Sequence, residues 1–187
     1  KCQRSFLICA TKQQRVKGLR ITVSTSVFVP KPYTPFQWCA QDAPEVIREK
    51  QIHLRQALNI RGVHYNWHDS LTSRLEACFA VGDRRMADVL YRAYELGCRL
   101  DGWSEQFRYD LWMQAFEDTG VDPAFYANRE RSTDELLPWD FIDIGVTKAY
   151  LKLEWERAKR AETTPDCRQK CNYCGLQRMK GLRKGCE

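Results

Sequence analysis

The chain has 187 residues, of which 43% are hydrophobic and 29% are charged. This length suits one domain of ordinary size or a piece of a larger protein, and the composition argues against global disorder. Mean hydropathy is −0.58, and no apolar run approaches the roughly 20 residues of a membrane span. The sequence therefore predicts a cytoplasmic protein without a membrane segment. Because the first residue is Lys1 and not Met, we expect that further chain precedes it.

The formal net charge of +6 is unevenly distributed. Residues 1–20 contain six Lys or Arg and no acid, and residues 152–187 contain ten Lys or Arg against five Asp or Glu, which leaves the middle mildly acidic. Basic ends can contact nucleic acid, although a solvated tail is the commoner explanation. RNA contact through the basic C-terminal tail is therefore kept as an alternative.

The first third of the chain has the pattern of an α/β unit. Residues 20–29 are β-branched and apolar, which predicts a buried strand of a parallel sheet. Three prolines between Pro30 and Phe36 exclude a helix or a central strand. A helix over 44–60 and a strand over 63–67 are expected next. One strand pair with one helix cannot bury its own faces, so residues 1–67 are expected to complete a larger sheet or barrel.

The rest of the chain is expected to be mainly helical. Polar residues that can act as N-caps precede several apolar stripes. The predicted helices run over 69–81, from Asp83 to Leu96, from Ser104 to about Asp118 and from Thr147 to about Ala161, with an irregular stretch at 121–145. The expected domains are an α/β part at 1–67, a helical extension at 68–162 and a cysteine-rich tail at 163–187.

Two further sets of residues have a structural and a functional interpretation. Asp83-Arg84-Arg85 has the residue types of a catalytic site, but it stands at a helix start, where Asp favours the helix dipole and Arg is solvated or pairs with Glu76. We expect capping there. Aromatic residues at helical spacings and loop anchors are expected to pack in the core, with base stacking as the alternative. They are Trp103, Phe107, Trp112, Phe116, Phe125, Tyr126, Trp139 and Phe141.

A series of motifs runs through the chain in a fixed order. The proline-rich stretch from Phe28 to Trp38 is the first, and later motifs are Leu75-Glu76-Ala77, Gly82-Asp83-Arg84-Arg85, Phe107–Trp112, Leu136–Asp140 and Thr164–Arg168. Together they resemble the C-terminal region of radical SAM proteins that carry an N-terminal cobalamin-binding domain, over about residues 20–175. The resemblance implies a partial (β/α) barrel, an iron–sulfur cluster, S-adenosylmethionine and cobalamin.

The resemblance also assigns a role to the proline-rich loop. It places this loop at the C-terminal end of a barrel strand, the face where barrel enzymes keep their chemistry. Thr34 is then a candidate to hydrogen-bond S-adenosylmethionine or substrate, and Lys31 a candidate to meet a carboxylate or phosphate. The alternative is a rigid loop that only turns the chain. Two positions depart from the family pattern, because Tyr33 and Gln177 stand where many relatives have His and a further Cys.

Four of the nine cysteines gather near the C-terminus, at positions 167, 171, 174 and 186. Thiolates at such short spacing suit a metal in a reducing compartment. Cys167-x3-Cys171-x2-Cys174 has the spacing of the catalytic radical SAM motif, but that motif stands early in its barrel, so we expect an accessory site here, with Cys186 as a fourth ligand. An auxiliary iron–sulfur cluster, structural zinc and free thiols all stay open.

The residues and the resemblance together predict the C-terminal part of a radical SAM enzyme. The whole enzyme would cleave S-adenosylmethionine to start radical chemistry on an unknown substrate, and this part alone would be inactive. The alternative is a zinc-knuckle RNA-binding module that uses the basic tail around Cys167–Cys186. The identity of the bound metal separates the two.

Overall fold

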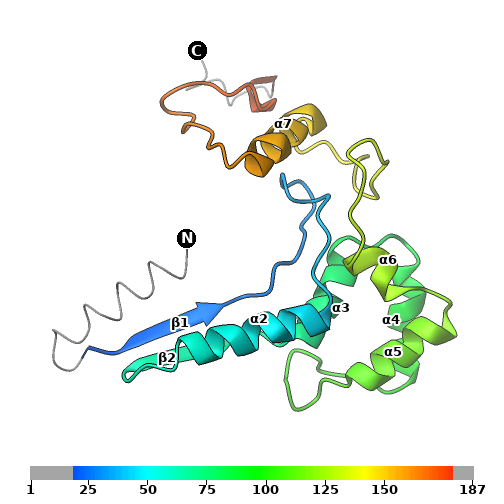
Figure 1. Ribbon diagram of the computed structural model, residues 1–187. Coiled ribbons are helices and arrows are strands. Elements are labelled where there is room, and N and C mark those ends of the chain that lie inside the picture. Colours follow the sequence, from blue (N-terminus) through cyan, green and yellow to red (C-terminus); the bar gives the residue numbers. More distant parts are fainter. Residues whose placement is uncertain (1–18, 179–187) are drawn as a thin grey trace. The chain divides into compact units, whose positions relative to one another are not determined.

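The computed structural model describes residues 19–178. These residues form two strands and six helices, followed by a 3₁₀ turn at Leu176–Arg178 (Figure 1). In chain order the elements are β1 (Ile21–Thr25), α2 (Pro44–Ala57), β2 (Val63–Trp67), α3 (Ser70–Ala80), α4 (Met86–Glu95), α5 (Tyr109–Asp118), α6 (Pro123–Ala127) and α7 (Lys148–Lys159). None of the helices in this part of the chain has the length and apolar character of a membrane span.

The described residues divide into two compact units. The first contains 19–28 and 42–74, and the second contains 29–41 and 75–178. The division falls within α3 and assigns the proline-rich segment to the second unit, whereas the sequence predicted boundaries after residues 67 and 162. The cysteine-bearing segment after α7 belongs to the second unit as well.

The first unit is a β-α-β arrangement. Strands β1 and β2 pair in parallel, with Ile21 opposite Val63. The guanidinium of Arg55 lies 5.8 Å from the centre of the Trp67 ring, so α2 covers the face of the sheet on which Trp67 lies. The opposite face is polar and exposed, and it presents Thr22, Ser24, His64 and Asn66. Residues 19–178 contain no further strand, so the partial barrel stays a prediction.

Two expectations for the first unit were wrong. The strand predicted over 20–29 ends at Thr25, and within β1 only Val23 is buried. The helix predicted to Ile60 ends at Ala57, and most of its apolar residues are exposed; Ile52, for example, is 50% exposed. Both differences have one cause: a two-stranded sheet under one helix offers too little surface to bury a continuous apolar run. The second strand has its predicted bounds.

The core of the second unit is aromatic and aliphatic. Its members come from the proline-rich segment and from the chain between α3 and α7, and the most completely buried are Trp38, Ala77, Cys78, Val81, Val89, Ala93, Ala115, Phe116 and Ala127. Trp38 is fixed because its carbonyl accepts a 2.8 Å hydrogen bond from the amide of Arg131. Cys78 and Cys98 are buried, which confirms that they are core residues.

Helix starts in the second unit follow the capping rules in part. Thr147 caps α7 as predicted, because its hydroxyl accepts from the amide of Tyr150 at 3.2 Å. The helix predicted from Ser104 is α5, which begins at Tyr109 instead, and its first turn has no side-chain cap. The short helix α6 was not predicted. The carboxylate of Asp122 caps α6 by accepting from the amide of Ala124 at 2.8 Å.

The aromatic residues do not all pack in the core. Trp112, Phe116, Tyr126 and Trp139 are buried as expected. Trp103 and Phe141 were predicted to be core residues, but they are 66% and 85% exposed. Both lie in turns and not on a helix, so no apolar helical face positions them toward the interior.

Candidate functional site

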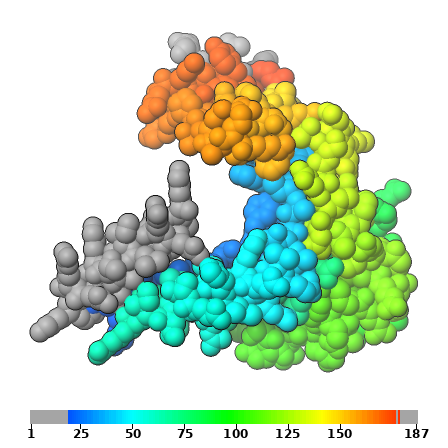
Figure 2. Space-filling view, in the orientation of Figure 1, coloured from blue at the N-terminus to red at the C-terminus, as the bar shows by residue number. Residues whose placement is uncertain are grey.

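The cysteine-bearing segment follows α7 and lies against it (Figure 2, orange to red). Cys167 is exposed, while Cys171 and Cys174 are partly buried, and all three thiols are free of disulfides. Cys186, the expected fourth ligand, lies outside the described residues.

One end of this segment is fixed to the start of α7. The carbonyl of Cys174 accepts hydrogen bonds from the amide of Thr147 at 2.9 Å and from its hydroxyl at 3.4 Å. Gly175 follows with φ +117°, and a Cβ atom there would lie 2.3 Å from the carbonyl oxygen of Gly145. Only glycine fits this conformation and this approach, so the Cys174-Gly175 pair is what allows the segment to dock.

The donor chemistry of this segment suits a metal, but its thiols do not converge. Between residues 19 and 178, no group of three or more His, Cys, Asp or Glu side chains is placed to hold a metal ion. Cys167, Cys171 and Cys174 are therefore near in sequence without forming a three-ligand set. Three thiols at this spacing fit zinc or an iron–sulfur cluster by chemistry. Binding would require the segment before Cys174 to close around the metal.

Cys171 borders a cavity of about 420 Å³, which Tyr150, Arg157 and Lys170 also line. Arg157 is held in place by Glu154 at 2.8 Å and by the hydroxyl of Thr164 at 3.2 Å. Burial, reinforced by the carboxylate of Glu154, raises the pKa of Tyr150, so this phenol keeps its proton at neutral pH. The cavity thus offers two cations and a phenol donor beside one of the candidate thiols.

The two residues proposed to bind a cofactor have contacts within the protein. Lys31 Nζ lies 2.5 Å from a carboxylate oxygen of Glu76, and both side chains are about half exposed. The hydroxyl of Thr34 donates to the carbonyl of Lys31 at 2.9 Å and so closes a turn of the proline-rich loop. These contacts are those of the alternative interpretation, a loop that turns the chain. The ligand roles of Lys31 and Thr34 stay predictions.

A residue that the sequence did not single out organises the same loop. Gln37 is 1% exposed, and its side-chain oxygen accepts from the amide of Tyr33 at 3.0 Å and from the indole of Trp139 at 2.7 Å. Tyr33 has φ +59°, an uncommon conformation for a non-glycine residue. Its phenol donates to the carbonyl of Trp139 at 2.6 Å. The strained turn is thus held from both sides.

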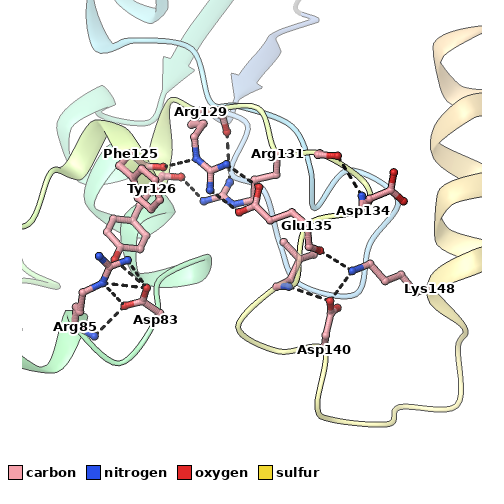
Figure 3. Close-up of polar contacts among 12 residues, drawn as sticks. Asp83, Arg85, Phe125, Tyr126, Arg129, Arg131, Asp134, Glu135, Asp140 and Lys148 are labelled. Carbon is pink, nitrogen blue, oxygen red and sulfur yellow. Dashed lines mark hydrogen bonds and ion pairs between the residues drawn. The ribbon is translucent and has the colours of Figure 1, made fainter.

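A polar network follows the chain from α6 to the start of α7 (Figure 3). Arg129 forms a two-pronged pair with Glu135, with both distances 2.7 Å, and this pair lowers the pKa of the Glu135 carboxyl. Lys148 Nζ lies 2.5 Å from Asp140. Arg131 is 4% exposed and donates to the carbonyl of Tyr126 at 2.6 Å. These contacts hold an irregular stretch in one conformation, which positions Gly145 and Thr147 for the cysteine-bearing segment.

Comparisons of this chain with protein-family profiles, with curated proteins and with solved structures gave no match.

Proposed function

We propose that this chain is the C-terminal part of a radical SAM iron–sulfur enzyme, and that Cys167, Cys171 and Cys174 hold an accessory metal centre in it. The observation that carries the proposal is the docking of the Cys174-Gly175 turn on Thr147. A tail without a function has no need of a glycine in a special conformation against a second glycine.

The arrangement around that turn supports the same proposal. The proline-rich loop contacts the irregular stretch before α7 at Trp139. The cysteine-bearing segment contacts the end of the same stretch at Thr147, and all of these residues belong to the second unit. Between these contacts, Asp140 forms an ion pair with Lys148. The two segments that the sequence associates with cofactors are therefore joined through one short and well-fixed stretch of chain.

The roles of the residues follow from their chemistry. The thiols of Cys167, Cys171 and Cys174 would bind the metal as thiolates, and Lys170 would offset part of their negative charge. Thr147 anchors the segment by donating hydrogen bonds to the main-chain carbonyl of Cys174. When bound, an iron–sulfur cluster of this kind supplies electron transfer, and S-adenosylmethionine supplies the radical chemistry of the whole enzyme. Cobalamin remains part of the resemblance, and no described residue is assigned to it.

Metal reconstitution tests the proposal. The chain is incubated without oxygen with iron and sulfide, and iron, sulfide and visible absorbance are measured for each chain. We expect a coloured protein, and we expect Cys171→Ser to abolish binding while the buried Cys98→Ser keeps it. Retention of full metal by Cys171→Ser would leave the free-thiol interpretation standing.

A second function is favoured by the form of the turn. Cys171-x2-Cys174 followed by a glycine of positive φ is also the arrangement of a zinc knuckle, and Arg168 beside it is highly exposed. If the purified chain is colourless and binds one zinc, the RNA-binding alternative gains support. It then predicts that labelled single-stranded RNA binds and that this binding weakens steeply with salt.

A further inference from the structure

Two motifs from distant parts of the sequence meet at one cavity of the second unit. Gly82-Asp83-Arg84-Arg85 lines this cavity together with Pro138 and Phe141. The cavity measures about 710 Å³, within the size range of small-molecule sites. Neither motif has a part in the proposed metal centre, so the cavity calls for an explanation of its own.

The backbone of the first motif is closely constrained. A Cβ atom on Gly82 would lie 2.3 Å from Cγ of Met86 and 2.7 Å from the carbonyl oxygen of Cys78. Glycine is therefore required for the end of α3 to approach the start of α4. The three charged residues that follow Gly82 all line the cavity.

Asp83 has no acceptor capacity left for a ligand. One carboxylate oxygen accepts from the amide and Nε of Arg85 at 2.9 and 3.0 Å, and the other accepts from Nη2 at 2.7 Å and from the phenol of Tyr126 at 3.1 Å (Figure 3). The charges of Asp83 and Arg85 cancel within this pair. Arg85 also stacks over the rings of Phe125 and Tyr126, with 5.8 and 5.5 Å to their centres, so it is a fixed wall.

Arg84 is the charged residue of the motif that takes no part in the Asp83–Arg85 pair. Its side chain is exposed and lines the cavity, and residues 19–178 provide no ion-pair partner for it. A guanidinium presents a planar fork of donors that matches the oxygens of a phosphate. The sequence left open that arginine here is solvated or pairs with Glu76, but Glu76 pairs with Lys31. Arg84 therefore borders the cavity without a charged partner among the described residues.

Phe141 supplies the complementary surface. It is 85% exposed, the same exposed fraction as Leu136 and as high as that of any large apolar side chain in the described residues. It lines the cavity together with Pro138 and the two arginines. An exposed aromatic ring beside an apolar proline is a stacking surface for a flat ring.

We propose that this cavity binds a phosphate ester that carries a flat aromatic ring, the chemistry of a nucleotide. Arg84 receives the phosphate, Phe141 and Pro138 contact the ring, and the Asp83–Arg85–Tyr126 set holds the wall. The site is independent of the metal centre, because it shares no residue with the cysteine-bearing segment.

Calorimetric titration of the whole chain tests this site with AMP, inorganic phosphate and adenosine as probes. We expect AMP to bind more tightly than either of its halves. Arg84→Gln should weaken AMP binding by about tenfold, the loss of one charge-assisted contact. Phe141→Ala should weaken AMP binding without changing that of phosphate. Arg61→Gln, which changes an exposed arginine in the first unit, is the matched control and should leave AMP binding unchanged.

Titration with a short single-stranded oligoadenylate distinguishes a free nucleotide from a nucleotide within single-stranded RNA. Equal affinity for AMP and the oligonucleotide indicates a free nucleotide, and much tighter binding of the oligonucleotide that still depends on Arg84 indicates a single-stranded RNA. The proposal is overturned if AMP shows no saturable binding, or if Arg84→Gln and Phe141→Ala both bind AMP as the unchanged chain does. Circular dichroism of each variant, expected to be unchanged, shows that these exposed substitutions have not unfolded the protein.

Discussion

The phenol of Tyr33 donates a hydrogen bond of 2.6 Å to the main-chain oxygen of Trp139, which lies 106 residues later in the chain. A second acceptor, the carbonyl of Ile142, is 3.2 Å away. Trp139 returns the contact through its indole, which donates to Gln37. The proline-rich loop is thus fastened to the stretch before α7 by side chains at both ends of the contact.

Removal of the Tyr33 hydroxyl tests this fastening. Burial, reinforced by the Asp140 carboxylate, raises the pKa of Tyr33, so the group is a donor at neutral pH. We expect Tyr33→Phe to lower the melting temperature by about 2–4 °C, the effect of one lost hydrogen bond in a chain of this size. Tyr91→Phe, at an exposed position on α4, is the control and should melt as the unchanged chain does. Equal melting of the two variants would contradict the fastening.

Gly175→Ala tests the docking of the cysteine-bearing segment. The added Cβ would meet the carbonyl of Gly145, and the residue would keep a positive φ, which together cost about 1–3 kcal/mol locally. We expect faster proteolysis after α7 and weaker metal binding, with the helical circular dichroism unchanged. Gly102→Ala, where a Cβ meets nothing within 4 Å, should have neither effect. If both alanine variants are cleaved at the same rate, Gly175 has no special role.

The pH dependence of stability should reveal the Asp83–Arg85 pair. The Arg85 side chain is the main cause that lowers the pKa of Asp83 from 3.8 to about 2. Ionised Asp83 therefore stabilises the fold at pH values above about 4, and this contribution is lost as the pH falls from about 4 towards 2. After allowance for solvent screening the contribution is about 1 kcal/mol. Urea unfolding should show Asp83→Asn less stable by that amount at pH 7 and progressively closer to the unchanged chain below pH 4. A constant difference over this range would rule out the pair as its cause.

Metal binding should also depend on pH, and like the stabilisation by Asp83 it should be lost as the pH falls. The thiols of Cys167, Cys171 and Cys174 must lose their protons to bind, so binding should release protons into a weakly buffered solution and should fail at low pH. The measurement is proton release during zinc titration, repeated with Cys171→Ser. Proton release of the same size from that variant would place the metal elsewhere in the chain.

S-adenosylmethionine provides a test of the accessory role. The cysteine-bearing segment follows α7 and docks on the start of that helix, whereas the catalytic motif of the proteins that the chain resembles stands early in a barrel. We expect the reconstituted chain with a reductant to give no 5′-deoxyadenosine by chromatography. Formation of this product at a steady rate would show that Cys167, Cys171 and Cys174 hold the catalytic cluster itself.

Elements whose bounds depend on residues close in the chain could be predicted from the sequence, and elements whose bounds depend on distant contacts could not. Thr147 caps α7 as predicted because capping depends on residues within one turn. Strand β2 has its predicted bounds because Gly62 precedes it and Val63, Tyr65 and Trp67 alternate with polar residues. Ser104 has the same capping chemistry but lies in a turn. The five-residue α6 is too short for an apolar period to reveal.

The candidate sites follow the same division. Cysteine spacing singles out Cys171 and Cys174 as candidate metal ligands without a structure, because the pattern lies within four consecutive residues. The role of Gln37 depends on a partner 102 residues away and on the positive φ of Tyr33, and neither is legible in a single sequence. The cavity at Gly82–Arg85 was equally hidden, because Phe141 comes from a stretch that the sequence shows only as irregular.

The contact between Cys174 and Thr147 has a consequence for genetics. On the cysteine side it uses only the main-chain oxygen, so the thiol takes no part in it. Anchoring and ligation at this position can therefore be lost one at a time: Cys174→Ser removes a sulfur and keeps the anchor, whereas Gly175→Ala keeps the sulfur and disturbs the anchor. Substitutions at these two neighbouring positions therefore distinguish a requirement for docking of the segment on Thr147 from a requirement for metal binding by the Cys174 thiol.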